Sequence, residues 1–108
     1  MKKMKKYDKL VRDKIPDIIK RKGEKFQIKR AMPELFISKL KEKIVEEAKE
    51  LKNAKTRQVE LEELADLEEV IDEFRSFARF KKSQIKKERD KKAKEKGRFK
   101  KRIILIKA

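Results

Sequence analysis

The sequence of 108 residues contains no cysteine and no histidine, and it has only two glycines and two prolines. The absence of cysteine excludes disulfides, thiolate zinc sites and cysteine nucleophiles. The absence of histidine excludes every catalytic scheme that requires imidazole. A metal ion bound by these side chains would therefore have oxygen ligands.

Long apolar segments are also missing. No apolar run approaches the roughly 20 residues that a membrane-spanning helix needs, and the basic start MKKMKKYDKL is not followed by the apolar stretch of a signal peptide. We therefore expect a cytoplasmic protein with no membrane partner.

We also expect one small domain over residues 1–108, with a modest core. Abundant Lys, Glu and Ile with few Gly and Pro are typical of a thermophile.

The net charge of +16 is distributed unevenly along the chain. Residues 1–30 hold 13 Lys and Arg against 4 Asp and Glu, residues 31–80 hold 9 against 13, and residues 81–108 hold 14 against 3. One interpretation is a sequence-independent RNA- or DNA-binding helical protein held by phosphate contacts. This interpretation is not favoured, because only Phe99 is interleaved with the basic runs and the acidic middle would repel a phosphate backbone.

Turn residues and apolar periodicity predict an all-α protein, an antiparallel helical bundle with short extended segments near its ends. A short helix is expected over PDIIKRK, with Pro16 in its first turn and Gly23 at its end. Two long helices follow, one over about 33–52 and one from Thr56, the expected N-cap, to about Phe80. Because the connection between them is short, we expect these two helices to be antiparallel.

The remaining segments are less regular. Residues 81–96 form a Lys-rich segment with only Ile85 and Ala93 as apolar members. We expect a charged surface helix that ends at Gly97, with partial disorder as the alternative. KFQIKR and RIILIK are each either a short strand or an extended segment.

Each long helix has an apolar stripe that includes carboxylates. At about 100° per residue, Glu47 lies within the stripe of the first long helix and Glu50 lies at its edge. In the second long helix Glu63 lies within the stripe and Asp66 at its edge. The apolar members are Phe36, Leu40, Ile44, Leu51 and Ala54 in the first stripe, and Val59, Leu67, Val70, Phe74 and Phe77 in the second. Both helices thus direct a carboxylate inward, followed by another three residues later.

These inward carboxylates have an ordinary interpretation and a functional one. A single glutamate on a long helix is usually solvated or paired with Lys at i,i+4. Four carboxylates at a dry interface are strongly unfavourable unless cations neutralise them. Mg²⁺, with Mn²⁺ as the alternative, suits a site of oxygen ligands that is shared with phosphate. A di-iron bundle is excluded because its ligands include histidine, and a purely structural helical dimer would leave the inward carboxylates unexplained.

The same carboxylates form a motif. EEAKE at 46–50, a gap of twelve residues and ELAD at 63–66 resemble the EExxE…ExxD signature of the MazG-like, all-α nucleoside triphosphate pyrophosphohydrolases. The opening YDKLVRDKIPDIIKRKG and the closing KGRFKKRIILIK resemble the ends of a small subgroup related to phosphoribosyl-ATP pyrophosphohydrolase. The resemblance covers nearly the whole chain. It departs at KGRF, where members of the subgroup often have a second glycine before the closing Phe.

The resemblance implies a Mg²⁺-dependent enzyme that hydrolyses a nucleoside triphosphate between its α and β phosphates and releases a monophosphate and pyrophosphate. It suggests a house-cleaning role on non-standard nucleotides. It also implies that Glu47, Glu50, Glu63 and Asp66 bind the metal, and we expect Glu47 or Glu50 to accept the proton of the attacking water. Glu46 matches the first position of the motif but points away from the stripe, so at most a supporting role is expected.

Binding a triphosphate also requires positive charge. The candidates come from the opening and closing motifs and from a lysine one turn before Glu47. They are Arg12, Lys14, Lys43, Arg98, Lys100 and Arg102. Taken singly, each of these residues is more often a solvated surface residue than a ligand-binding one.

Self-association is expected because one short chain has too little surface to cover both stripes. We predict a homodimer or higher homo-oligomer in which Phe74 and Phe77 contribute to a helix-on-helix interface. The alternative is a monomer whose core is completed by the N-terminal helix and the RIILIK tail.

Overall fold

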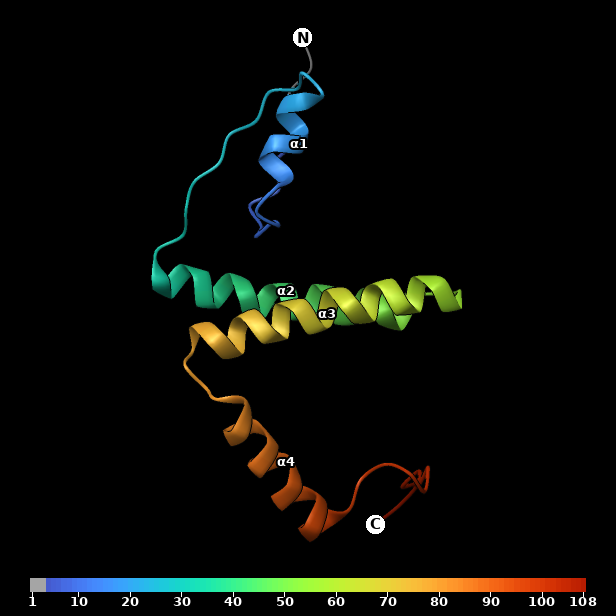
Figure 1. Ribbon diagram of the computed structural model, residues 1–108. Helices are drawn as coiled ribbons and strands as arrows, with labels where there is room; N and C mark the ends of the chain where they lie inside the picture. The colour runs from blue at the N-terminus through green and yellow to red at the C-terminus, as the bar shows by residue number, and fades with distance from the viewer. Residues whose placement is uncertain (1–3) are drawn as a thin grey trace. The chain divides into compact units, whose positions relative to one another are not determined.

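The computed structural model describes residues 4–108, and all regular secondary structure in this range is helical (Figure 1). The helices are α1 (Ile15–Arg21), α2 (Pro33–Asn53), α3 (Arg57–Phe77) and α4 (Lys82–Lys96). The predicted all-α fold is confirmed. No strand occurs between residues 4 and 108, so neither KFQIKR nor RIILIK forms a strand. No described helix is long and apolar enough to cross a membrane.

The chain divides into two compact units. The first extends to Ala78 and contains α1, α2 and α3, whereas the second covers Arg79–Ala108 and contains α4 and the C-terminal segment. The acidic middle of the sequence therefore lies almost entirely in the first unit, and the most basic segment lies in the second.

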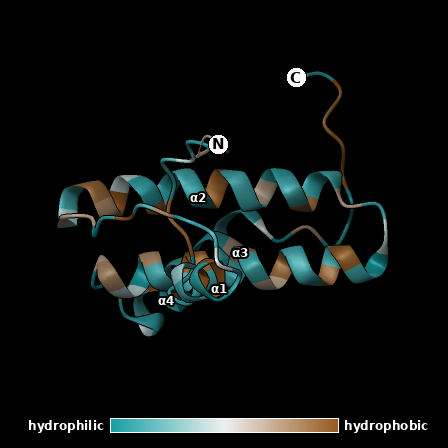
Figure 2. Cartoon of the chain, turned by 90° about the horizontal axis from the view of Figure 1, so that it is seen from above, coloured by the Kyte–Doolittle hydropathy of each residue, from teal (hydrophilic) through white to brown (hydrophobic). Residues whose placement is uncertain are grey.

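Helices α2 and α3 form an antiparallel hairpin and lie side by side in both views (Figures 1 and 2). Pro33 opens α2, where its missing N–H leaves no hydrogen bond unmade. The Thr56 hydroxyl accepts a hydrogen bond from the Val59 backbone N–H at 3.2 Å, which confirms Thr56 as the N-cap of α3. Only residues 54–56 separate the two helices, and this short connection forces the chain to reverse.

The end of α3 differs from the prediction. The helix ends at Phe77 and not near Phe80, because Arg79 has a φ of +64°, in the left-handed region, and a right-handed helix cannot continue through it. The Ala78 N–H donates to the Phe74 carbonyl at 2.9 Å and closes the last turn. Nothing in the residue types around Arg79 marks this end, since left-handed residues are usually glycine or asparagine.

The interface between α2 and α3 is where the apolar stripes meet. Leu40, with 1% of its surface exposed, is the one fully buried apolar side chain among residues 4–108. The Phe36 and Phe77 rings pack edge to face, with centroids 4.7 Å apart, near the open end of the hairpin. Figure 2 shows apolar bands along both helices between polar residues. The core is thus a single thin layer, and it also contains Glu47, which is 7% exposed.

The second unit has no comparable core. Helix α4 contains no buried residue, and Ala93 is its one half-buried position. The helix ends at Gly97, whose φ of +82° suits glycine because it has no Cβ. The expectation that residues 81–96 form a charged helix ending at Gly97 is confirmed.

Candidate metal centre

Three of the predicted metal ligands meet at the interface of the hairpin. Glu47 and Glu50 lie one turn apart on α2, and the antiparallel packing brings Glu63 of α3 to the same place. One carboxylate oxygen from each residue lies within 4.8 Å of the other two. Two ligands on opposite sides of a divalent cation lie roughly 4–5 Å apart, given bond lengths of about 2.0–2.6 Å. The separation therefore suits oxygen ligands that share one cation.

The three carboxylates of the cluster differ in how deeply they are buried. Glu47 is buried, Glu63 is half-buried and Glu50 is exposed, so the cluster opens to solvent on the side of Glu50. One oxygen of Glu47 and one of Glu63, Oε2 in each case, are buried and have no hydrogen-bond partner. A buried carboxylate oxygen without a partner is costly. The residues thus fit a bound cation, which would offset part of this cost.

The close carboxylates perturb each other's ionisation. The pKa of Glu63 is raised from 4.5 to about 7. Desolvation is the largest cause, and hydrogen bonds to Glu50 and Glu47 and repulsion by their charges act in the same direction. Below about pH 7 Glu63 therefore holds a proton in the absence of a cation, and a cation that binds there must displace it.

Two lysines partly neutralise the rim of the cluster. Lys43 lies 3.6 Å from the Glu47 carboxylate and 3.3 Å from the Glu46 carboxylate, and Lys9 of the N-terminal segment lies 3.2 Å from Glu46. Partial burial opposes ionisation of Glu46, but the hydrogen bonds from Lys9 and Lys43 outweigh it and lower its pKa. Glu46 is thus bonded to two lysines and lies outside the three-carboxylate group, and its supporting role stays a prediction.

Asp66 is not part of the three-carboxylate group. Its Oδ1 accepts a hydrogen bond from Arg12 Nη2 at 2.8 Å. This contact joins a residue expected to bind phosphate to a residue expected to bind metal, and it draws the N-terminal segment against α3. The roles of both residues stay predictions, but the structure places them in direct contact.

The other basic candidates are placed differently. Lys14 is the exposed residue that precedes α1. Arg98 pairs with Asp90 at 3.2 Å within the second unit, where Lys100 and Arg102 are also exposed. Their part in phosphate binding stays a prediction. Of the six basic candidates, Lys43 contacts the carboxylate cluster directly and Arg12 contacts Asp66.

Sequence reasoning did not single out the residues that hold the N-terminal segment on the hairpin. Lys39 Nζ of α2 donates to the Asp8 backbone carbonyl at 2.8 Å, and Lys9 reaches Glu46 on the same helix. The opening motif contained both Asp8 and Lys9, but a charged pair separated by more than thirty residues leaves no periodic signal.

No family model, curated protein or solved structure matches this chain.

Proposed function

We propose that this protein is a Mg²⁺-dependent nucleoside triphosphate pyrophosphohydrolase, with Mn²⁺ as the alternative metal. The observation that carries the proposal is the cluster of Glu47, Glu50 and Glu63, in which two buried oxygens lack partners. Such a cluster is unfavourable without a cation, and an oxygen-only site of this kind suits a hard divalent ion. The resemblance of EEAKE and ELAD to the MazG-like signature supports the same assignment.

Each residue of the site has a proposed part. A Mg²⁺ ion held by Glu47, Glu50 and Glu63 would neutralise phosphate charge and lower the pKa of a bound water. Glu50 is the exposed member of the cluster, so its carboxylate is accessible to accept a proton from an attacking water. Asp66 would be available as a further ligand if Arg12 bound a phosphate oxygen in its place.

Positive charge beside the cluster supports the choice of an anionic substrate. The Arg12 side chain is 61% exposed and hydrogen-bonded to Asp66 through Nη2, and its planar guanidinium can bind two phosphate oxygens at once. Lys43 is held beside Glu47 and neutralises part of the cluster. In this proposal the substrate is cleaved between its α and β phosphates in a house-cleaning reaction on non-standard nucleotides.

Pyrophosphate release from a panel of nucleoside triphosphates with Mg²⁺ tests the proposal. Glu50→Gln removes the carboxylate charge at an exposed position, so it should abolish turnover and leave the fold intact. Glu69→Gln, an equally conservative change at an exposed position of α3 outside the cluster, is the matched control and should leave turnover unchanged. A folded protein that releases no pyrophosphate from any triphosphate would show the proposal to be wrong.

A further inference from the structure

The second unit has an excess of positive charge that the unit itself does not neutralise. Residues 79–108 hold 15 Lys and Arg against 3 Asp and Glu. The ion pairs within this unit, which is described throughout, are Lys86–Asp90 at 2.7 Å and Arg98–Asp90 at 3.2 Å, so both use the same carboxylate. A helix that is polar on every side and rich in one charge gains little from packing. An anionic partner would relieve its repulsion.

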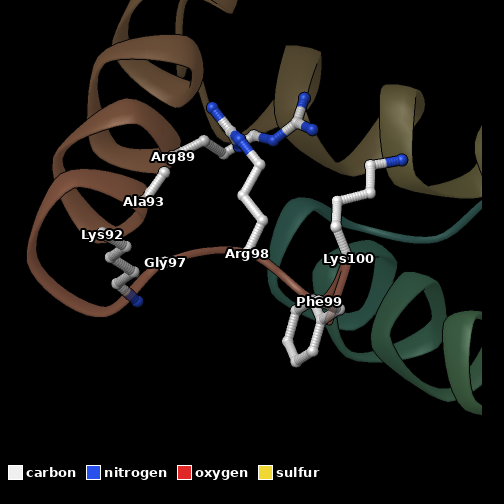
Figure 3. Close-up of a pocket in the computed structure, with 7 residues that line it drawn as sticks. All are labelled: Arg89, Lys92, Ala93, Gly97, Arg98, Phe99 and Lys100. Atoms are coloured by element: carbon white, nitrogen blue, oxygen red, sulfur yellow. The ribbon is translucent and has the colours of Figure 1, made fainter. Parts of the chain in front are cut away.

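Two adjoining hollows form where the chain leaves α4. The larger, of about 480 Å³, is lined by the cationic residues Arg89, Lys92, Arg98 and Lys100 and by Phe99 (Figure 3). The smaller, of about 230 Å³, lies beside Arg98, Phe99, Lys101 and Arg102. No acidic residue lines either hollow. They share Arg98 and Phe99, so this pair lies between two basic concavities.

The backbone after Gly97 separates the charged side chains from the aromatic one. The left-handed φ of Gly97 turns the chain out of α4. Figure 3 shows the Arg98 and Lys100 side chains on one side of the chain and the Phe99 ring on the other. The Phe99 side chain is 96% exposed. An exposed ring flanked by cations is the combination that binds a nucleic-acid strand, because the ring stacks on a base while the cations contact phosphates.

We propose that the second unit binds single-stranded nucleic acid without sequence preference. Arg89, Lys92, Arg98 and Lys100 contact successive phosphates, and Phe99 stacks on an unpaired base. A single strand is favoured over a duplex because its bases are free to stack on a side chain. The proposal does not depend on the carboxylate cluster, whose residues belong to the first unit.

Fluorescence anisotropy with the full chain and labelled twelve-nucleotide single strands, one RNA and one DNA of mixed sequence, tests the proposal. Both strands should bind at 50 mM salt with similar affinity, because no contact that would read the 2′-hydroxyl is proposed. The slope of log affinity against log salt should approach about −3, for the four proposed phosphate contacts at roughly −0.7 each. If neither strand binds at 50 mM salt, the proposal is wrong.

Substitution of Phe99 tests the proposed base stacking most directly. Phe99→Ala should weaken binding by roughly 5- to 150-fold, because stacking on one base contributes about 1–3 kcal/mol. The ring is exposed, so the change should not affect folding. Phe99→Tyr keeps an aromatic face and should bind like the parent. If Phe99→Ala binds as tightly as the parent, the ring does not stack and the proposal is wrong.

A matched pair of double variants separates a defined site from general attraction. Arg89→Ala with Lys92→Ala removes two cations that line the larger hollow, whereas Lys87→Ala with Lys94→Ala removes two from the opposite face of α4. The first pair should weaken binding more and make the salt slope shallower by about 1.4. Equal weakening by both pairs would overturn the proposed site.

Two further controls separate this site from the enzyme and from a membrane partner. Glu50→Gln should leave nucleic-acid binding unchanged, whereas Phe99→Ala should leave pyrophosphate release unchanged, so failure of one proposal is distinguishable from failure of the other. Ile103 to Ile106 are 77–80% exposed beside the basic residues, which makes an anionic lipid surface the competing partner. Binding to phosphatidylserine vesicles with no binding to either strand would overturn the proposal in favour of a membrane.

Discussion

Arg12 donates a hydrogen bond to Asp66 at 2.8 Å, and this pair holds the N-terminal segment against α3 beside the carboxylate cluster. Both side chains are partly exposed, at 61% and 39%, so the pair itself stabilises the fold by no more than about 1 kcal/mol. Its significance lies in its position. It joins a cation suited to phosphate and a carboxylate of the predicted metal-binding motif.

The first prediction concerns Arg12. Arg12→Ala should change the free energy of unfolding by at most about 1 kcal/mol, because the pair is exposed, but it should raise KM or lower kcat for a nucleoside triphosphate. Steady-state kinetics and thermal unfolding measure the two effects separately. Arg12→Lys keeps the charge but not the planar guanidinium, and it should recover only part of the activity. Unchanged kinetic constants in Arg12→Ala would exclude a role in substrate binding.

The second prediction concerns the metal. Mg²⁺ or Mn²⁺ should raise the melting temperature, because a cation that binds the folded cluster stabilises it by mass action. A concentration ten times the dissociation constant contributes about 1.4 kcal/mol, or roughly 5–10 °C for a domain of this size. Glu63→Gln should reduce the rise, whereas Glu69→Gln, outside the cluster, should not. Melting curves that do not change at 10 mM of either ion would contradict the site.

The third prediction concerns pH. The pKa of Glu63 is raised to about 7 in the folded chain from an ordinary value of 4.5, so the folded state binds more protons than the unfolded state between these values. The contribution of Glu63 to stability is therefore fully present below about pH 4.5 and is lost as the pH rises through about 7. In metal-free buffer, the stability of the parent should fall relative to Glu63→Gln across this window.

Unfolding by denaturant at a series of pH values measures this difference. Added Mg²⁺ should reduce the loss of stability at the alkaline end, because the ion replaces the displaced proton. A stability difference between the parent and Glu63→Gln that stays constant from pH 4.5 to pH 7 would contradict the coupling among the three carboxylates.

The fourth prediction concerns assembly. The hairpin buries one apolar layer, yet Leu61, Leu64 and Ile71 of α3 remain 46–61% exposed, and Phe77 is 40% exposed although its ring contacts Phe36. We expect a second copy to cover these residues, with Phe74 and Phe77 at the edge of the interface. Light scattering at low micromolar concentration should give at least twice the 13.0 kDa of one chain.

Leu64→Lys tests the same surface. A charge at this position opposes burial between two helices, so the variant should dissociate and lose stability. Ser76→Lys adds the same charge at another exposed position of α3 and serves as the control. A parent mass equal to one chain would show that the dimer prediction is wrong.

Local features of the sequence determined the helices and most of their ends. Pro33 begins α2, Thr56 caps α3 and Gly97 ends α4, because each residue acts on its own backbone or on that of its near neighbours. The 3.6-residue period likewise placed Glu47 and Glu63 on the inward faces. The exception was Arg79, where a left-handed conformation ends α3 without the glycine that usually marks such a position.

Only the tertiary structure decided which groups meet. The register of α3 on α2 brings Glu63 to Glu47 and Glu50, and this register follows from how side chains on both helices pack, which no single helix specifies. The contact of Arg12 with Asp66 joins positions 54 residues apart. The sequence by itself determined which helix faces carry carboxylates. The packing of the hairpin determined that three of them share one place and that the fourth binds an arginine, because distances between remote residues depend on how the chain folds back on itself.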